Sequence, residues 1–449
     1  MSDKNDASHR IDLNRLSPEQ RTFTVVSYML MWWSSVIVIQ GFMLGQSMLP
    51  PNGGLNIGQA MTALVMAACI LAFFFASNGH AGNKYGIPFA IHARSSFGFY
   101  GSKIAILFRG VPAIFWLGIC TWIGGSAING VTQMIFGFGN VYVYFFILLV
   151  VQGVLAALGI KTIKWVENVL AIIIVLIMIY MMVSITRNFS EQLTQNWNAT
   201  GSWGMPFVTS IVGLVGAVFT SSVNSADLSR YLVKGTKATW IANITGIFVP
   251  KIFLVSLGIL SGAALGIWDP VTALIQVAPN QWSAILILIF IAIAQVTTNL
   301  TMNLMPPALM LMDFFKKLKW PISVCIISVL AIATCPWILF THEGFFGLIN
   351  AYSAFLGPVL GVMLADYYFI RKMKLDANQL YEHGCGPLYR FTKGWSLAAI
   401  IAVAIGGVFG IMFNSLSWLV AAPIAFVLYL ILYPIFYGKN PRVPDVDEA

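Results

Sequence analysis

Charged residues are scarce in this chain. Only 9% of its 449 residues are Asp, Glu, Lys or Arg, and 58% are hydrophobic, whereas an ordinary soluble domain is about 25% charged. A composition this apolar excludes a soluble globular fold. The formal net charge of +9 is spread between the apolar runs, so it does not indicate a nucleic-acid partner.

Cysteine and histidine are also few, and neither forms a recognisable site. The cysteines have no paired spacing and lie mostly inside apolar runs, which indicates small core residues rather than disulfides or metal ligands. The histidines lie in the termini or predicted loops, and none forms an HExxH-type pair. The sequence therefore does not favour a membrane-embedded enzyme, and we expect no cofactor. The cysteines are Cys69, Cys120, Cys325, Cys335 and Cys385, and the histidines are His9, His80, His92, His342 and His383.

Long apolar runs, in contrast, are abundant. The mean hydropathy is +0.82, and runs of about 20 residues recur, each long enough to cross about 30 Å of hydrocarbon as a helix. The sequence thus predicts an all-α polytopic membrane protein with twelve transmembrane helices. They are expected at residues 24–49, 56–77, 104–132, 141–160, 166–186, 206–231, 240–266, 282–305, 320–340, 346–370, 395–413 and 416–437.

The basic residues predict how these helices are oriented. With both termini in the cytoplasm, 23 of the 25 Lys and Arg residues fall in cytoplasmic segments or in the adjoining ends of spans, as the positive-inside rule requires. The exceptions are Arg187 outside and Lys251 within a span, whose partner the sequence does not show. The expected connections are a cytoplasmic tail (1–21), a cytoplasmic loop partly ordered under the bundle (78–102), an extracellular loop (187–204), a cytoplasmic loop (371–394) and a cytoplasmic tail (438–449).

Two of the predicted spans carry helix-weakening residues. Gln40, Gly41 and Gly45 lie near the middle of the first span, and the sixth contains the polar run TSSVNS at 220–225, whose side chains compete for backbone hydrogen bonds. Transporters built from two inverted five-helix repeats interrupt the first helix of each half, where the freed backbone lines a site. The spacing of five spans therefore favours a transporter over a channel, enzyme or scaffold. Helix–helix packing is the alternative explanation of either run alone.

Residues 295–307, QVTTNLTMNLMPP, place several hydrogen-bonding side chains at the end of an apolar run. At about 100° per residue, Thr297 and Thr298 share a helix face with Ala294. This face has no carboxylate, but hydroxyls and carbonyls freed at the break in 24–49 can replace the hydration shell of a monovalent cation. Sodium suits such a site better than a proton, which needs a titratable carrier.

Asn299 and Asn303 share the adjacent face, one helical turn apart. Each amide offers two donors and an acceptor, which suits a neutral planar ligand that carries both groups, such as a heterocyclic lactam. An anion would call for Arg, Lys or a helix N-terminus. The alternative role of these asparagines is a contact between helices.

Two tryptophans in the third predicted span, Trp116 and Trp122, offer flat aromatic surfaces. An indole face can stack on a planar ring, and we expect this of Trp116. Trp122 is explained equally well as a residue of the membrane–water interface.

Five stretches of the chain together resemble the cytosine/purine/uracil/allantoin permease family, the first nucleobase–cation symporter family. The resemblance implies a leucine-transporter-like fold with inverted five-helix repeats at 22–186 and 205–370, followed by two further helices within 371–437. It also implies uptake of a nucleobase or related ring across the plasma membrane, which in bacteria is the inner membrane, often with sodium. The stretches are NGHAGNKYGIPFAIHARSSFGFYGSK (78–103), WLGICTWIGGSAIN (116–129), ADLSRY (226–231), TTNLTMN (297–303) and GPVLGVMLADYYFIRK (357–372).

The resemblance also implies two sets of binding residues. The sodium ligands of the family fall on the carbonyls of Val36 and Ile39, on Ala294, Thr297 and Thr298, and on the Thr220 hydroxyl. The substrate contacts fall on Gln40, Trp116, Asn299 and Asn303, with backbone near Gly216 and Ala217.

Two positions depart from the family pattern. Cys120 stands where several members have a glutamine that bonds the ring, and Val218 stands where others have an aromatic residue. We expect Cys120 to line the substrate site and the neighbouring Phe219 to supply any second aromatic face.

Alternatives remain open at this stage. The same fold could carry an amino acid, an amine or a vitamin precursor, although the predicted site shows no carboxylate or carboxylate anchor. A proton could replace sodium, with Asp227 or Asp366 as carrier, but each lies near an arginine, Arg230 or Arg371, so gate or structural ion pairs are favoured. The expected partners are a small-molecule substrate and the lipid bilayer, with no obligate protein partner.

Overall fold

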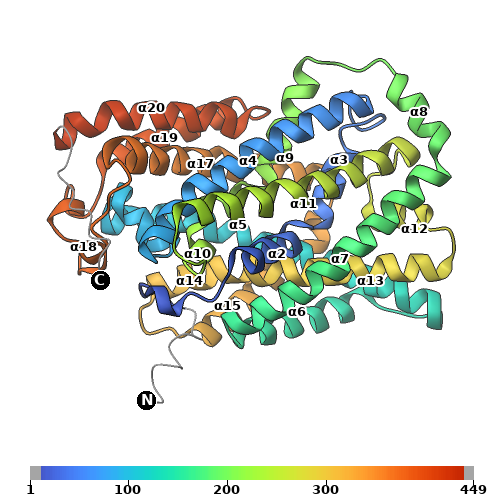
Figure 1. Ribbon diagram of the computed structural model, residues 1–449, viewed down its shortest axis with the longest axis horizontal. Coiled ribbons are helices and arrows are strands. Elements are labelled where there is room, and N and C mark those ends of the chain that lie inside the picture. Colours follow the sequence, from blue (N-terminus) through green and yellow to red (C-terminus); the bar gives the residue numbers. More distant parts are fainter. Residues whose placement is uncertain (1–11, 439–449) are drawn as a thin grey trace.

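The computed structural model describes residues 12–438 as helices that run side by side in one bundle (Figure 1). Within these residues, eight helices are long and apolar enough to cross a membrane, a bent pair adds a ninth, and three shorter apolar helices accompany them. The long ones are Ile57–Tyr85 (α4), Phe89–Phe136 (α5), Ile160–Asn188 (α7), Met205–Val223 (α9), Thr236–Leu265 (α11), Gln281–Phe314, Glu343–Ile370 and Ser417–Tyr437 (α20).

Two of the long helices contain a widened, π-helical turn. Gln281–Phe314 consists of α13 (Gln281–Thr298), the π-helical segment η2 (Asn299–Leu304) and α14 (Met305–Phe314). The other consists of α17 (His342–Leu364) and the π-helical η3 (Ala365–Ile370). The shorter apolar helices are Val141–Ala157 (α6), Trp320–Ala333 (α15) and Leu397–Met412 (α19). The remaining segments are Pro18–Gln20 (η1), Ser190–Asn198 (α8), Ala226–Ser229 (α10), Pro270–Val277 (α12), Pro336–Leu339 (α16), Ala377–Tyr381 (α18) and Pro387–Tyr389 (η4).

The bent pair is the predicted broken first span. It consists of α2 (Val25–Val36) and α3 (Ile39–Gln46), which meet at 57°. The break falls within four consecutive β-branched residues, 36–39, whose side chains restrict the backbone and weaken a helix. The prediction of an interrupted first helix is confirmed.

Glycines let α3 approach α11 at backbone contact. A Cβ atom built on Gly45 would lie 2.5 Å from the Val255 carbonyl oxygen, and one built on Gly258 would lie 2.1 Å from the Phe42 carbonyl oxygen. Only glycine fits at such separations, so these residues fix α3 against α11.

The predicted break in the sixth span lies later than expected. Thr220 to Val223 remain helical in α9, and the chain turns at Asn224 and Ser225 before α10. The turn is held by α4, because Asn78 donates to the Ser222 carbonyl at 3.0 Å. The interruption is therefore at the end of the polar run and not at its middle.

The expected loop at 78–102 is mostly helix, which corrects that prediction. Helix α4 continues to Tyr85, and α5 begins at Phe89 and bends at Gly98, where φ is 80°. The polar side chains that suggested a loop are buried and hydrogen-bonded to other elements: Asn83, for example, donates to the Leu232 carbonyl at 3.0 Å. The expectation that this segment is ordered and packed against the bundle holds.

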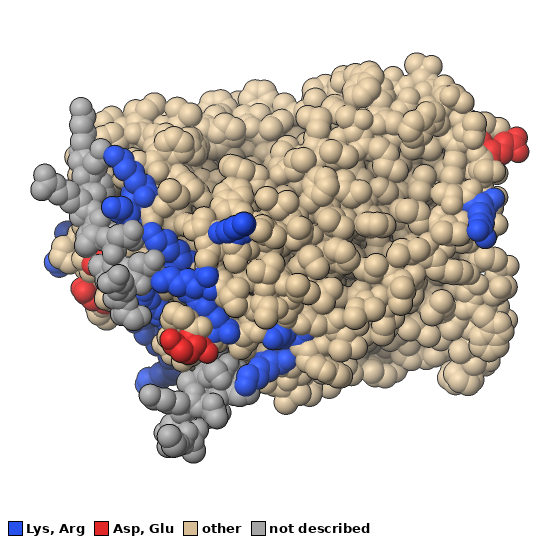
Figure 2. Space-filling model, viewed as in Figure 1, with Lys and Arg blue, Asp and Glu red and all other residues tan. Residues whose placement is uncertain are grey.

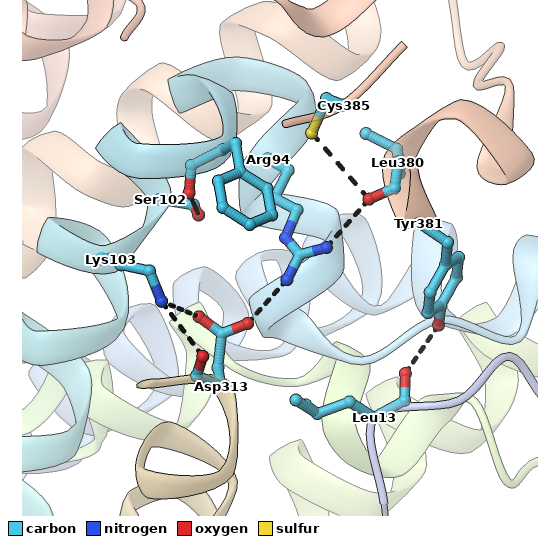
Figure 3. A network of polar contacts seen from close by, with 9 residues as sticks. Leu13, Arg94, Ser102, Lys103, Asp313, Leu380, Tyr381 and Cys385 are labelled. Carbon is cyan, nitrogen blue, oxygen red and sulfur yellow. Dashed lines mark hydrogen bonds and ion pairs between the residues drawn. The ribbon is translucent and has the colours of Figure 1, made fainter. Parts of the chain in front are cut away.

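Lysine and arginine gather at one end of the bundle, on the left in Figure 2, which we call the basic end. There Asp313, at the end of α14, binds Arg94 at 2.6 Å and Lys103 at 3.1 Å (Figure 3). Arg94 also donates to the Leu380 carbonyl at 2.9 Å, and Tyr381 donates to that of Leu13 at 2.8 Å. These contacts tie α5, α14, α18 and the segment before η1 together.

Candidate substrate and cation site

A small cavity lies where the break between α2 and α3 meets α5, α9, α11 and η2. Its volume is about 40 Å³, which is room for a few water molecules at most. Eight of the residues predicted to bind substrate or sodium line this cavity. The lining residues are Val36, Val38, Gln40, Gly41, Leu44, Trp116, Cys120, Ala217, Val218, Thr220, Ser221, Lys251, Thr298, Met302 and Asn303.

Two amides converge on Cys120 at one wall of this cavity. Gln40 donates to its sulfur at 3.1 Å and to the Gln295 side-chain oxygen at 3.3 Å. Asn303 approaches the same sulfur at 3.5 Å. The side-chain oxygen of Gln40 has no hydrogen-bond partner among the described residues, so it is an acceptor available to a ligand.

Asn299 lies behind the cavity wall and does not line it. Its oxygen accepts from Asn303 at 2.8 Å, and its nitrogen donates to Gln152 at 2.9 Å and to Thr121 at 3.2 Å. Asn299 therefore orients the Asn303 amide. Gln152, missed by the sequence analysis, anchors this chain from α6. Its signal was a lone amide within an apolar run.

The π-helical turn of η2 widens the helix that carries Asn303. Arg109, which is buried on α5, donates to the Met302 carbonyl at 2.7 Å and to the Asn224 side chain at 2.6 Å. The arginine thus joins this turn to the break after α9.

Trp116 lines the cavity and is 6% exposed. Its ring makes edge contacts with Phe345 and Tyr352, at centroid separations of 5.6 and 6.4 Å. Trp122 packs instead against Tyr142 and Trp337, at 5.1 and 5.9 Å.

Phe219, the residue after Val218, faces away from the cavity. Phe219 packs against Phe74 and Trp418, at centroid separations of 5.7 and 5.5 Å, and Val218 takes the lining position. Phe219 therefore does not provide a second aromatic face in this structure, which corrects the prediction. Gly216 also lies outside the lining, with Ile349 3.2 Å from a Cβ built on it.

The helix face that carries Thr297 and Thr298, which we call the hydroxyl face, packs against the last turn of α2. Thr298 donates to the Ser35 carbonyl at 2.9 Å, and Thr297 donates to the carbonyls of Ser34 and Ala294 at 3.1 and 3.0 Å. The chain then breaks after Val36 and resumes as α3 at the buried Ile39. The structure thus gathers hydroxyl and carbonyl oxygens here, and Thr220 lies across the cavity on α9.

A carboxylate stands beside this face, contrary to the expectation that it has none. Glu167 of α7 is fully buried and accepts hydrogen bonds from the hydroxyls of Ser34, Ser35 and Thr301. The Ser35 and Thr301 hydroxyls are themselves 2.7 Å apart. Glu167 was not among the predicted site residues because it lies at the predicted edge of a span. Its signal was an acidic residue flanked by an apolar run.

The two aspartates considered as proton carriers are bound in structural contacts near the basic end. Asp366 pairs with Arg371 at 2.7 Å and accepts from Tyr429 at 2.8 Å. Asp227 accepts from the Phe89 backbone and the Asn224 side chain, both at 2.8 Å. Neither lines the cavity. In the described residues no cluster of three or more His, Cys, Asp or Glu could hold a metal ion.

Sequence comparison identifies the family to which the chain belongs. A profile of permeases for cytosine/purines, uracil, thiamine and allantoin matches residues 16–435. The chain belongs to this permease family. The predicted membership, and a transport function in place of an enzymatic one, are confirmed.

Relatives of the permease cover nearly its whole length. An allantoin permease of Bacillus subtilis is 26% identical over 485 residues, covering 98% of this chain and 96% of the relative. A hydantoin permease of Microbacterium maritypicum is 28% identical over 408 residues, covering 86% and 81%.

Solved structures show the same fold. Mhp1, a nucleobase-cation-symport-1 family transporter in a closed conformation with bromovinylhydantoin bound, superposes with a TM-score of 0.85 at 23% identity, covering 98% of the permease and 97% of Mhp1. A Na+-coupled sialic acid symporter in an outward-open state superposes with a TM-score of 0.69 at 12% identity, covering 95% and 92%. The permease is therefore a helical membrane protein of the leucine-transporter-like fold.

Proposed function

We propose that the permease imports a nucleobase or a related planar N-heterocycle, of the cytosine, purine, uracil, allantoin or hydantoin type, by alternating access coupled to sodium. The observation that carries this proposal is the cavity at the broken first span. It places Gln40, Trp116 and Asn303 around one space and shares Thr298 with the hydroxyl face.

The cavity chemistry suits a planar ring with donors and acceptors. The free Gln40 oxygen can accept from a ring N–H, and the Asn303 amide can exchange hydrogen bonds with a ring carbonyl. Trp116 offers the stacking surface. Since about 40 Å³ is too small for a heterocycle, binding must displace lining side chains, and the flexible Met302 is the best candidate.

In this proposal, sodium binds between α2 and α13. Its ligands are the carbonyls of Val36, Ile39 and Ala294 with the hydroxyls of Thr297 and Thr298, and Thr220 is a further candidate. The two threonines now donate to carbonyls of α2, so they would turn their lone pairs toward the ion. A sodium ion here would hold α13 against the break between α2 and α3, which lies directly before Gln40. Binding of the ion would thereby be coupled to the substrate site.

The arrangement of the chain in the membrane follows from the same proposal. The bent pair, the eight long helices and the three shorter apolar helices account for twelve membrane spans, in two inverted repeats (22–186 and 205–370) and two added helices. The basic end faces the cytoplasm, and both termini lie there, in the plasma membrane of the cell.

Alternating access also needs a closed and an open face. The basic end is closed by the contacts of Asp313 with Arg94 and Lys103. Toward the other end, a second cavity of about 320 Å³ shares Leu44 with the central one. A substrate entering from outside would pass Leu44, and release inside would require the Asp313 contacts to break.

Proton coupling is the second candidate, and Glu167 is the observation that favours it. A buried carboxyl beside the hydroxyl face could carry a proton in place of sodium. With sodium, the ionised Glu167 would instead balance the charge of the ion.

Uptake into proteoliposomes tests both candidates. Purified permease is reconstituted, and uptake of labelled cytosine, hypoxanthine, uracil, allantoin and hydantoin is measured under an inward sodium gradient, with choline as the matched control. We expect at least one ring to accumulate with sodium only. Accumulation in choline driven by a pH gradient would replace sodium with a proton, and no accumulation of any ring, with uptake of amino acids, amines or vitamin precursors, would reject the substrate class.

A further inference from the structure

One lining residue has no role in the function proposed so far. Lys251, on α11, is 1% exposed and lines the central cavity. Among the described residues that line this cavity, it is the one with a formal charge. No hydrogen bond or ion pair from its ammonium group to another described residue is formed.

The ammonium group of Lys251 lies beside the start of α3. Its nitrogen lies 3.8 Å from the point that a Cβ on Gly41 would occupy, at the start of α3. Two turns further along, Gly258 packs directly on the Phe42 backbone. Helix α11 therefore holds Lys251 against α3 and leaves its charge facing the cavity.

A second feature of the same wall attracts negative charge. The eight-residue helix α3 begins at Ile39, one residue after Val38, which lines the cavity. The N-terminus of a helix carries a partial positive charge and unpaired N–H groups. Lys251 and the start of α3 thus lie on the same wall of the cavity.

An unpaired ammonium group buried inside a membrane protein is costly, and such groups pair with a partner or mark a ligand path. We infer that the substrate carries a negative charge, a carboxylate on or near its planar ring, that pairs with Lys251 in the closed state. This inference rests on the proposed function and deepens it, and it changes the expectation of a neutral ligand that the asparagines suggested.

The pairing of Lys251 with a substrate carboxylate also explains why the transporter would rarely close without substrate. When the cavity is open to water, the ammonium group is hydrated. Closing the empty cavity strips that water from an unpaired charge, whereas closing around a carboxylate leaves an ion pair. Lys251 would therefore favour closure with substrate over closure without it.

Matched ligand pairs test the inference on the unaltered protein. Thermal-shift titrations in sodium compare uracil with uracil-6-carboxylate and hydantoin with hydantoin-5-acetate, and they include glutarate as a carboxylate without a ring. We expect at least one carboxylate ring to bind about tenfold or more tightly than its neutral parent. Equal or tighter binding of both neutral parents would overturn the inference.

Variants then assign the effect to Lys251. Lys251→Met should lower the ratio of carboxylate affinity to neutral-parent affinity by about tenfold or more, with both affinities measured on the same variant. Lys251→Arg should retain the preference. The matched control is Lys237→Met, which removes an exposed lysine from the same helix and should change neither affinity.

The remaining outcomes separate this inference from the proposed function. Binding of neutral rings with no effect of Lys251→Met rejects the anionic substrate and leaves the heterocycle permease intact. If glutarate binds but no ring does, the heterocyclic substrate class is rejected, and a carboxylate that pairs with Lys251 is supported. If no ring and no carboxylate binds, both are rejected. If Lys251→Met does not fold, the wild-type pairs and Lys251→Arg still decide.

Discussion

The hydroxyl of Thr298 donates a 2.9 Å hydrogen bond to the backbone carbonyl of Ser35. This contact joins α13 to the last turn of α2, one residue before the helix ends at Val36 and five before Gln40. Thr298 also lines the central cavity. A ligand that changes this contact should therefore also shift the residues that line the substrate cavity. This is the basis of the coupling proposed above.

Thr298→Ala should weaken the response to sodium. The variant removes one of the proposed hydroxyl ligands, so the sodium concentration for half-maximal uptake should rise by about tenfold or more, while Thr298→Ser, which keeps the hydroxyl, should remain close to the native value. Uptake at graded sodium concentrations measures this. An unchanged sodium response in Thr298→Ala would show that the hydroxyl only bonds the helix.

Glu167→Gln separates the two coupling ions. With sodium as the ion, loss of the carboxylate charge should weaken sodium binding, but transport should persist at saturating sodium. With a proton as the ion, the amide cannot carry it, and gradient-driven uptake should stop while exchange of substrate across the membrane continues. The decisive comparison is uptake against exchange in the same vesicles; we predict the first pattern.

Asn303→Ala should abolish measurable binding of the ring, and Asn303→Asp should weaken it strongly. Leaving buried ligand groups unpaired costs about 1–3 kcal/mol each. Gln152→Ala should have a smaller effect in the same direction, because Gln152 orients Asn303 only through Asn299. Normal transport by Asn303→Ala would assign both asparagines to helix packing.

Trp116 and Cys120 should control which rings bind. Trp116→Ala should lower affinity by about tenfold or more, and Trp116→Phe should keep part of it, since stacking on an aromatic side chain contributes about 1–3 kcal/mol. Cys120→Gln adds a donor and an acceptor at the point where Gln40 and Asn303 meet, so it should change ring preference without changing sodium dependence. A Cys120→Gln variant with native selectivity would remove this thiol from the substrate site.

Asp313→Asn should open the basic end more often. It removes the charge that binds Arg94 and Lys103 (Figure 3). In a background where the other four cysteines are serine, an impermeant thiol reagent applied from the cytoplasmic side should label Cys120 several-fold faster in Asp313→Asn than in the parent. Glu382→Gln, which removes an exposed acidic residue directly after α18 that does not bind Arg94 or Lys103, is the control and should not change the rate.

The apolar runs and scattered charges were sufficient to predict a helical membrane transporter with an interrupted first span. The interruption was predicted from Gln40, Gly41 and Gly45, whereas the helix breaks in the β-branched residues just before them, 36–39. Segment 78–102 could not be predicted, because its polar residues satisfy backbone groups of elements more than a hundred residues away. Local composition contains no information about such partners.

Of the residues predicted to share a helix face, Thr298 and Asn303 line the central cavity. Thr297 does not line it, and Asn299 lies behind Asn303. Glu167 and Gln152 were missed because each comes from a different helix and acts only through packing. Phe219 was misplaced because a side chain's direction on α9 depends on which neighbours, here Phe74 and Trp418, surround it.

The most direct test of the account is the thermodynamic linkage between sodium and substrate on the purified permease. The substrate Kd is measured in sodium and in choline, and the sodium affinity is measured with and without the same substrate. The account predicts that each ligand tightens the other by the same factor, as linkage requires, and that Thr298→Ala reduces both factors together. A substrate Kd that is equal in sodium and choline would contradict it.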